Sequence, residues 1–96
     1  MAAAVEWQII TLHYSALHYI EAYFATKNVH SKNHPERDER IQRDPNTQPI
    51  YRNYSRLKIF SHNARYLTVG APKSRVTEME KHLAAIKTHL SQFVEP

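Results

Sequence analysis

The sequence contains no cysteine and a single glycine, Gly70. Without cysteine there can be no disulfide bond, no thiolate zinc site and no thiol nucleophile. Glycine-rich phosphate loops need several positions where the backbone approaches phosphate without a Cβ atom, so one glycine excludes Rossmann and P-loop proteins. The same lack of glycine excludes a serine hydrolase with a nucleophile elbow, because that strand-turn-helix motif needs glycines. The lack of cysteine fits a cytoplasmic protein.

Long apolar runs are missing as well. No stretch of 18 residues is free of polar side chains, and the first six residues lack the basic segment of a secretory signal. We therefore expect a cytoplasmic protein that does not enter a membrane. The chain has 96 residues, of which 42% are hydrophobic and 23% charged, so we expect one globular domain over residues 1–96.

Positive charge is concentrated in the middle of the chain. Residues 27–75 hold eleven of the thirteen Lys and Arg residues against four acidic residues, a local excess of +7, whereas the flanking segments sum to −3. A basic segment of this kind favours an anionic partner such as RNA, DNA or a nucleotide.

Helical periodicity dominates the sequence, and no segment alternates like a β-strand. Helices are predicted over residues 5–27, 34–43, from a cap at Asn46 or Thr47 to about Tyr66, and over about 74–93. Asn33 or His34 can cap the short second helix. The apolar faces of the three long helices are formed by Val5, Ile9, Leu12, Ala16, Ile20 and Phe24; by Ile50, Tyr54, Leu57, Ser61 and Ala64; and by Val76, Met79, Leu83, Ile86, Leu90 and Phe93. This pattern predicts an all-α fold, a small antiparallel up-and-down bundle of three long helices and one short helix.

The first predicted helix has a second stripe on its far side, formed by Trp7, Tyr14, His18 and Ala25. A helix that needs burial on two sides is either central in its bundle or covered on one side by a second copy of the chain. We therefore expect a homodimer.

A polar set lies on this second stripe, because Tyr14, His18 and Glu21 follow one another at about one-turn intervals. A buried carboxylate needs a cationic partner, and the candidate cations are Arg37, Arg40 and Arg65. Two interpretations remain open. The set is either a structural polar network that links helices, or a site where His, Tyr and Arg side chains converge.

His34 and Arg37 stand at the start of the short helix, where free backbone N–H groups favour an anion. They either bind phosphate, or they act locally, His34 as a cap and Arg37 as a partner of Glu21. His30 and His34 have a metal-ligand spacing, but Pro35 and the polar loop before it argue against a helix there. We expect neither a metal ion nor another cofactor.

Arg56 and His62 are a third candidate pair. An Arg and a His can cleave RNA together, with the His as general acid or base at the 2′-OH and the guanidinium on the phosphate. Six steps of a helix place these two side chains about 120° apart, so they do not meet on one helical face. His82 and His89 lie on one flank of the last helix, and we expect them at its rim.

Several motifs between residues 7 and 66 resemble the prokaryotic HEPN-like proteins. They are Trp7 with Tyr14-Ser-Ala-Leu-His18-Tyr-Ile-Glu-Ala22, then His30, His34 and Arg37, then Tyr51, Tyr54 and Leu57, and finally Ala64-Arg65-Tyr66. The resemblance implies a helical bundle that pairs into a dimer. Many members are ribonucleases of toxin and defence systems, with a catalytic Arg followed after four to six residues by a His.

Arg56 and His62 are separated by five residues and so have the spacing of this catalytic pair, although Leu57 follows the Arg where the family usually has a polar residue. The resemblance thus implies an RNA- or nucleotide-binding protein that is either a metal-independent ribonuclease or a non-catalytic module whose dimer, or complex with a nucleotidyltransferase-like protein, is its function. The residues assigned to catalysis are His34, Arg56 and His62; to substrate binding, His18, Arg37, Tyr54, Arg65 and Tyr66; and to a structural polar network, Tyr14, Glu21 and Arg40.

Overall fold

The computed structural model describes residues 4–30, 32–66 and 73–93. These residues form helices joined by turns, and they contain no strand, so the predicted all-α fold is confirmed. The elements are α1 (Ala4–Thr26), α2 (His34–Arg43), the short 3-10 helix η1 (Gln48–Ile50), α3 (Tyr51–Tyr66) and α4 (Lys73–Leu90). In the part of the chain that is described, no helix combines the length and the apolar character needed to cross a bilayer.

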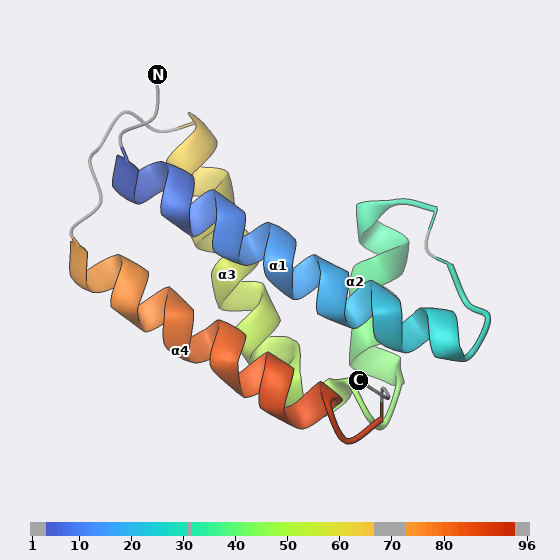
Figure 1. Cartoon of the computed structure of the whole chain (residues 1–96). Coiled ribbons are helices and arrows are strands. Elements are labelled where there is room, and N and C mark those ends of the chain that lie inside the picture. Colours follow the sequence, from blue (N-terminus) through green and yellow to red (C-terminus); the bar gives the residue numbers. More distant parts are fainter. Residues whose placement is uncertain (1–3, 31, 67–72, 94–96) are drawn as a thin grey trace.

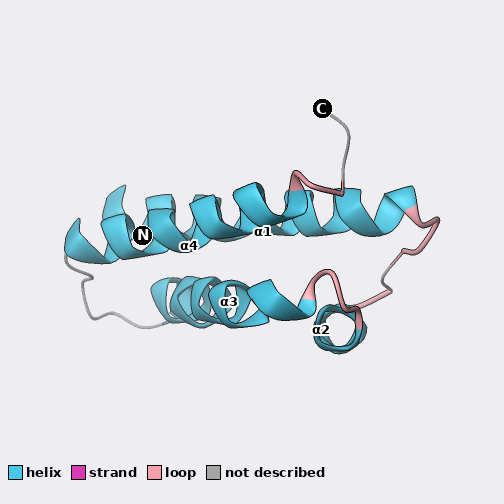
Figure 2. Ribbon diagram, turned by 90° about the horizontal axis from the view of Figure 1, so that it is seen from below, coloured by secondary structure: helices cyan, strands magenta, loops and turns pink. Residues whose placement is uncertain are grey.

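The long helices form two layers (Figures 1 and 2). α1 and α4 lie side by side in one layer and run in the same direction, while α3 lies in the second layer and runs the opposite way. α1 contacts both α3 and α4, and α3 also contacts α4. The short α2 is seen end-on in Figure 2, so it crosses the long helices instead of running along them.

The predicted boundaries are correct for α2 and need correction elsewhere. Asn33, not His34, caps α2, because its Oδ1 atom accepts a 2.9 Å hydrogen bond from the backbone N–H of Glu36. Thr47 takes the N-cap position of the 3-10 helix that precedes α3, but its side chain makes no capping hydrogen bond. Thr47 Oγ1 donates instead to the Ile41 carbonyl at 2.8 Å, and residues 48–50 form a 3-10 turn before α3. The last helix ends at Leu90, three residues earlier than predicted.

The core lies between the two layers and uses the predicted apolar faces. Besides Ser61, its buried residues on these faces are Ile9, Ala16, Ile20, Phe24, Ile50, Tyr54, Leu57, Met79, Ile86 and Leu90. Ile10, His13 and Tyr23 are also buried, although they lie outside the predicted face of α1. Their burial follows from the position of α1, which packs on α3 and α4 at once. By contrast, Trp7 and Tyr14 of the second stripe are 54% and 49% exposed.

Asp44, in the turn after α2, ties this turn to the C-terminal end of α1. The Tyr23 hydroxyl donates to both carboxylate oxygens, at 2.9 and 3.1 Å, and Lys27 Nζ donates to Oδ2 at 2.8 Å. The backbone N–H of Asn46 donates to Oδ1 at 2.8 Å. Burial acts to raise the pKa of Asp44, but the hydrogen bonds from Lys27, Asn46 and Tyr23 outweigh it and hold the pKa below its usual value.

Candidate functional site

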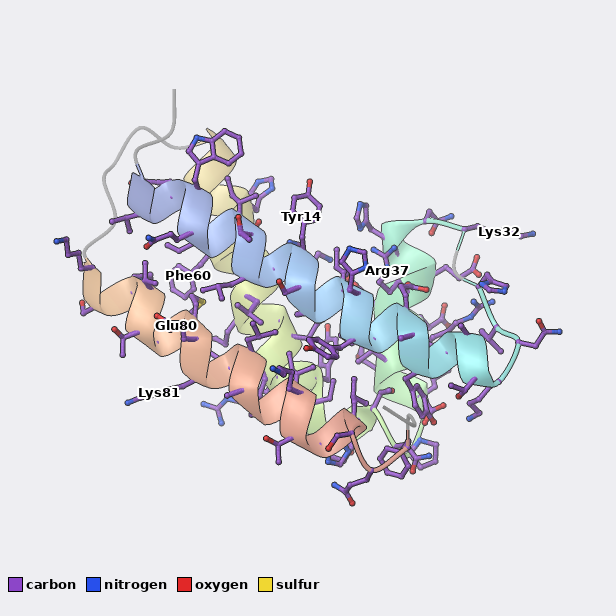
Figure 3. All side chains as sticks on the ribbon, in the orientation of Figure 1. Tyr14, Lys32, Arg37, Phe60, Glu80 and Lys81 are labelled. Carbon is purple, nitrogen blue, oxygen red and sulfur yellow. The ribbon has the colours of Figure 1, made fainter. Side chains whose placement is uncertain are left out.

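Arg37 links α2 to α1. Figure 3 labels Arg37. The Nε atom of this residue lies 2.5 Å from Glu21 Oε1, and its Nη1 atom lies 2.9 Å from His34 Nδ1. Of the two candidate cations whose side chains the structure describes, Arg37 and Arg40, it is Arg37 that pairs with Glu21. This is one of the two interpretations left open by the sequence, in which Arg37 acts locally as the partner of Glu21.

Asp38, the next residue of α2, links this helix to α3. Its carboxylate accepts a 3.0 Å hydrogen bond from the Tyr54 hydroxyl and a second one from Lys58 Nζ. Burial, helped by the charge of Asp38, raises the pKa of Tyr54 well above its usual range, so the hydroxyl keeps its proton and remains a donor. We call this set of six side chains the α2 cluster: Glu21, His34, Arg37, Asp38, Tyr54 and Lys58.

An open groove runs along α3 beside the α2 cluster and shares Tyr54 and Lys58 with it. This α3 groove has a volume of about 240 Å³, and it is lined by Tyr51, Tyr54, Ser55, Lys58, Ile59, His62 and Asn63. The lining residues recur at intervals of three and four, so they come from one face of the helix. The lining combines aromatic, hydroxyl, amide, ammonium and imidazole groups, and it includes no carboxylate.

Arg56 and His62 are not brought together within one chain. His62 is exposed and lines the α3 groove, whereas Arg56 faces α4, where its Nη2 atom lies 3.1 Å from Glu78 Oε2. This separation agrees with the angle expected from a continuous helix. A site that needs both side chains therefore requires a second chain.

Among the residues predicted as a polar network (Tyr14, Glu21 and Arg40), Glu21 pairs with Arg37, which lies outside the set. Arg40 pairs with Glu36 one turn away on α2, at 2.7 Å, and not with Glu21. Such an i,i+4 contact forms within one helix and needs no neighbour. Tyr14 is half-exposed, and its ring stacks on that of His13 at a centroid distance of 6.1 Å.

The remaining predicted residues occupy different places. His18 is exposed on α1. Arg65 and Tyr66 belong to the last turn of α3, but their side chains lie outside the described part of the structure. Among the residues that are described, no three His, Asp or Glu side chains are grouped so that they could hold a metal ion.

Two residues of the α2 cluster, Asp38 and Lys58, were not identified from the sequence as parts of a site. They are 20 positions apart and on different helices. The one available signal is that Lys58 flanks the apolar face of α3, a position where a cation can extend its end toward a neighbouring helix.

Chemically, the α3 groove can hold a small ring against Tyr51 and an anionic group near Lys58 and His62. The α2 cluster fixes Lys58 and Tyr54 through Asp38, so the groove is built on side chains with defined positions. Comparison of the chain with protein-family models, with curated proteins and with solved structures finds no match, so the candidate site rests on its own geometry.

Proposed function

We propose that this chain is a HEPN-like helical protein that binds RNA or a nucleotide in the α3 groove. The observation that carries the proposal is the composition of that groove, in which Lys58 and His62 lie beside tyrosine rings, while the carboxylate that pairs with Lys58, that of Asp38, does not line the groove. The helix itself has four Lys and Arg residues and no acidic residue. Aromatic rings bind bases by stacking, and cations bind phosphate, so this is a pattern suited to nucleic acid.

The groove volume sets the size of the ligand. At about 240 Å³ the groove is smaller than pockets that enclose a drug-sized molecule, so it suits one base or one ribose-phosphate unit. In this arrangement Tyr51 stacks on the base and Lys58 contacts the phosphate. His62 is the proton-transfer group if RNA is cleaved without a metal, as general base at the 2′-OH or general acid at the leaving oxygen.

The proposal includes a homodimer formed through the outer face of α1. Trp7 and Tyr14 are large side chains that are about half-exposed in the single chain, which supports a covering partner on this side. We expect a particle of twice the 11.3 kDa chain mass in sedimentation equilibrium at micromolar concentration. The mass of a single chain at all concentrations would contradict the proposed dimer.

Replacement of Lys58 by glutamine tests the groove directly. We expect the affinity for a short fluorescent oligoribonucleotide to fall by about three- to tenfold, because one phosphate contact is lost. The slope of log affinity against log salt should become smaller by about one. Fluorescence anisotropy at several salt concentrations measures both quantities.

Lys81→Gln is the matched control, since Lys81 is an exposed lysine on α4 outside the groove. It should leave the affinity unchanged. Equal affinities for the natural chain and Lys58→Gln would contradict the proposed binding site. His62→Gln separates binding from catalysis, because it should abolish any RNA cleavage while the groove still binds.

A second function is a non-catalytic interaction module. The observation that favours it is that Arg37 and Lys58 are each already paired with a carboxylate, Glu21 and Asp38 respectively, as expected for a structural network. The partner would then be a second copy or a nucleotidyltransferase-like protein. Complete lack of RNA and nucleotide binding by the natural chain, together with a stable dimer, would favour this alternative.

A further inference from the structure

Three nitrogen groups from α3 and α4 converge on one carboxylate, that of Glu78. Arg56 Nη2 lies 3.1 Å from Oε2, and Arg75 Nη1 lies 2.9 Å from Oε1. His82 Nε2 lies 3.8 Å from the same Oε2 atom that Arg56 contacts. Two guanidinium groups and an imidazole thus face a single negative charge, which leaves the set with an excess of positive charge.

Phe60 holds the two guanidinium groups in place. The guanidinium carbon of Arg56 lies 4.8 Å from the centroid of the Phe60 ring, and that of Arg75 lies 4.0 Å from it. Stacking on an aromatic face fixes the plane of a guanidinium group while leaving N–H groups at its edge free to donate. Both arginines are therefore positioned before any ligand arrives (Figure 3 labels Phe60).

Asn53 sets the orientation of the imidazole. Its side-chain nitrogen lies 3.1 Å from His82 Nδ1. An amide nitrogen is a donor only, so Nδ1 accepts, and the neutral ring carries its proton on Nε2. That N–H is on the side of the ring that faces Glu78.

Glu78 is an ionised carboxylate in this environment. The hydrogen bond from Arg56 lowers its pKa, outweighing the effect of burial, and the charges of Arg75 and Arg56 lower it further. The side chains of Arg56, Arg75 and Glu78 all remain partly exposed, so a dissolved ligand can reach them. The carboxylate occupies the position that another oxyanion would take between the same donors.

We infer that Arg56, Arg75 and His82 form a phosphate-binding site in which Glu78 stands in the place of the ligand. A phosphate group offers several oxygens to donors that are already arranged around a carboxylate, and planar guanidinium groups suit it well. The phosphate belongs either to a phosphodiester of RNA or to the terminal group of a nucleotide. The site uses none of the residues that line the α3 groove, so it does not depend on the function proposed above.

Replacement of Glu78 by glutamine is the primary test, with inorganic phosphate as the probe. Glutamine keeps the size of the side chain and removes its charge, so phosphate no longer competes with a resident anion. Removal of one like charge at about 4 Å should increase the affinity at least about fivefold, as measured by NMR titration of backbone amides. Glu39→Gln is the control, because Glu39 is also paired with an arginine, Arg43, on an exposed part of α2. It should leave phosphate binding unchanged.

Replacement of Arg75 by glutamine in the Glu78→Gln chain should remove the gain in affinity. Arg43→Gln in the same background is the matched control and should retain it, since Arg43 lies on α2. Equal phosphate affinities for the natural chain and Glu78→Gln, or a gain that survives Arg75→Gln, would overturn the inference. If Glu78→Gln does not fold, as judged by circular dichroism, Arg75→Gln in the natural chain decides the matter. Phosphate-induced amide shifts at residues 75–82 should then be lost, and their persistence would overturn the inference.

A second probe separates the two sources of phosphate. The dinucleotide ApA has a phosphodiester only, whereas pApA also has a 5′-terminal phosphate. If Glu78→Gln binds both dinucleotides more tightly than the natural chain does, the site takes a phosphodiester. If it binds only pApA more tightly, the site takes a terminal phosphate. A failure of the RNA-binding proposal for the α3 groove can be distinguished from a failure of this inference. Lys58→Gln removes a cation of the groove, but it should leave inorganic phosphate binding at Arg56 and Arg75 unchanged.

Discussion

Replacement of Leu57 by alanine is expected to lower the free energy of unfolding by about 2–5 kcal/mol. Leu57 is fully buried in the middle of α3, and this helix packs against both α1 and α4. Alanine would leave a cavity between the two layers, because the three helices are held by many other contacts and can close the gap only in part. Urea unfolding followed by circular dichroism measures the change.

Ile59→Ala is the control for this prediction. Ile59 stands two positions away on the same helix, but it is 48% exposed on the groove side. Its replacement removes a similar number of methyl groups from a surface position and should cost less than about 1 kcal/mol. A loss for Leu57→Ala no larger than that for Ile59→Ala would show that α3 is not packed between α1 and α4 in this way.

Replacement of Asp44 by asparagine should lower the free energy of unfolding at neutral pH by about 1–2 kcal/mol. Asparagine can still accept a hydrogen bond from the Tyr23 hydroxyl, but the charged acceptor for Lys27 is gone. The turn after α2 would then be held less firmly to the C-terminal end of α1. Glu39→Gln serves as control, because an exposed ion pair contributes little.

The same substitution has a defined pH dependence. The pKa of Asp44 is lower in the folded chain than its ordinary value of 3.8, so its ionised form is favoured by folding. This contribution is complete above about pH 5, well above the unfolded-state pKa, and is lost as the pH falls through the folded-state pKa. The difference in stability between the natural chain and Asp44→Asn should therefore be largest near neutral pH and shrink below about pH 5. A difference that stays constant from pH 7 to strongly acidic pH would contradict the structural account of Asp44.

The helices could be predicted because apolar residues repeat with the period of a helix. Ile9, Ile20, Leu57 and Ile86 were each placed on a buried face, and the structure buries all four. The 3-10 turn before α3 was not predictable in the same way, since the Thr47 hydroxyl at its N-cap position donates to the Ile41 carbonyl and makes no capping hydrogen bond. That contact exists only once the turn after α2 has folded.

The candidate sites could be predicted only in part. Periodicity gives the angle of a side chain around its own helix, so it correctly separated Arg56 from His62. It does not say which neighbouring helix a side chain meets. The pairing of Asp38 with Lys58 and that of Arg56 with Glu78 both depend on how α2, α3 and α4 are placed, and no spacing along the chain encodes these contacts.

The most direct measurement of the central claim is a map of the residues that respond to RNA. Backbone amide NMR spectra of the natural chain, recorded during titration with a short oligoribonucleotide, should show the largest shifts at the residues that line the α3 groove, among them Tyr51, Ser55, Lys58, His62 and Asn63. The same titration of Lys58→Gln should show smaller shifts at equal RNA concentration. Unchanged spectra along α3, or responses confined to the outer face of α1, would contradict the assignment of the groove as the binding site.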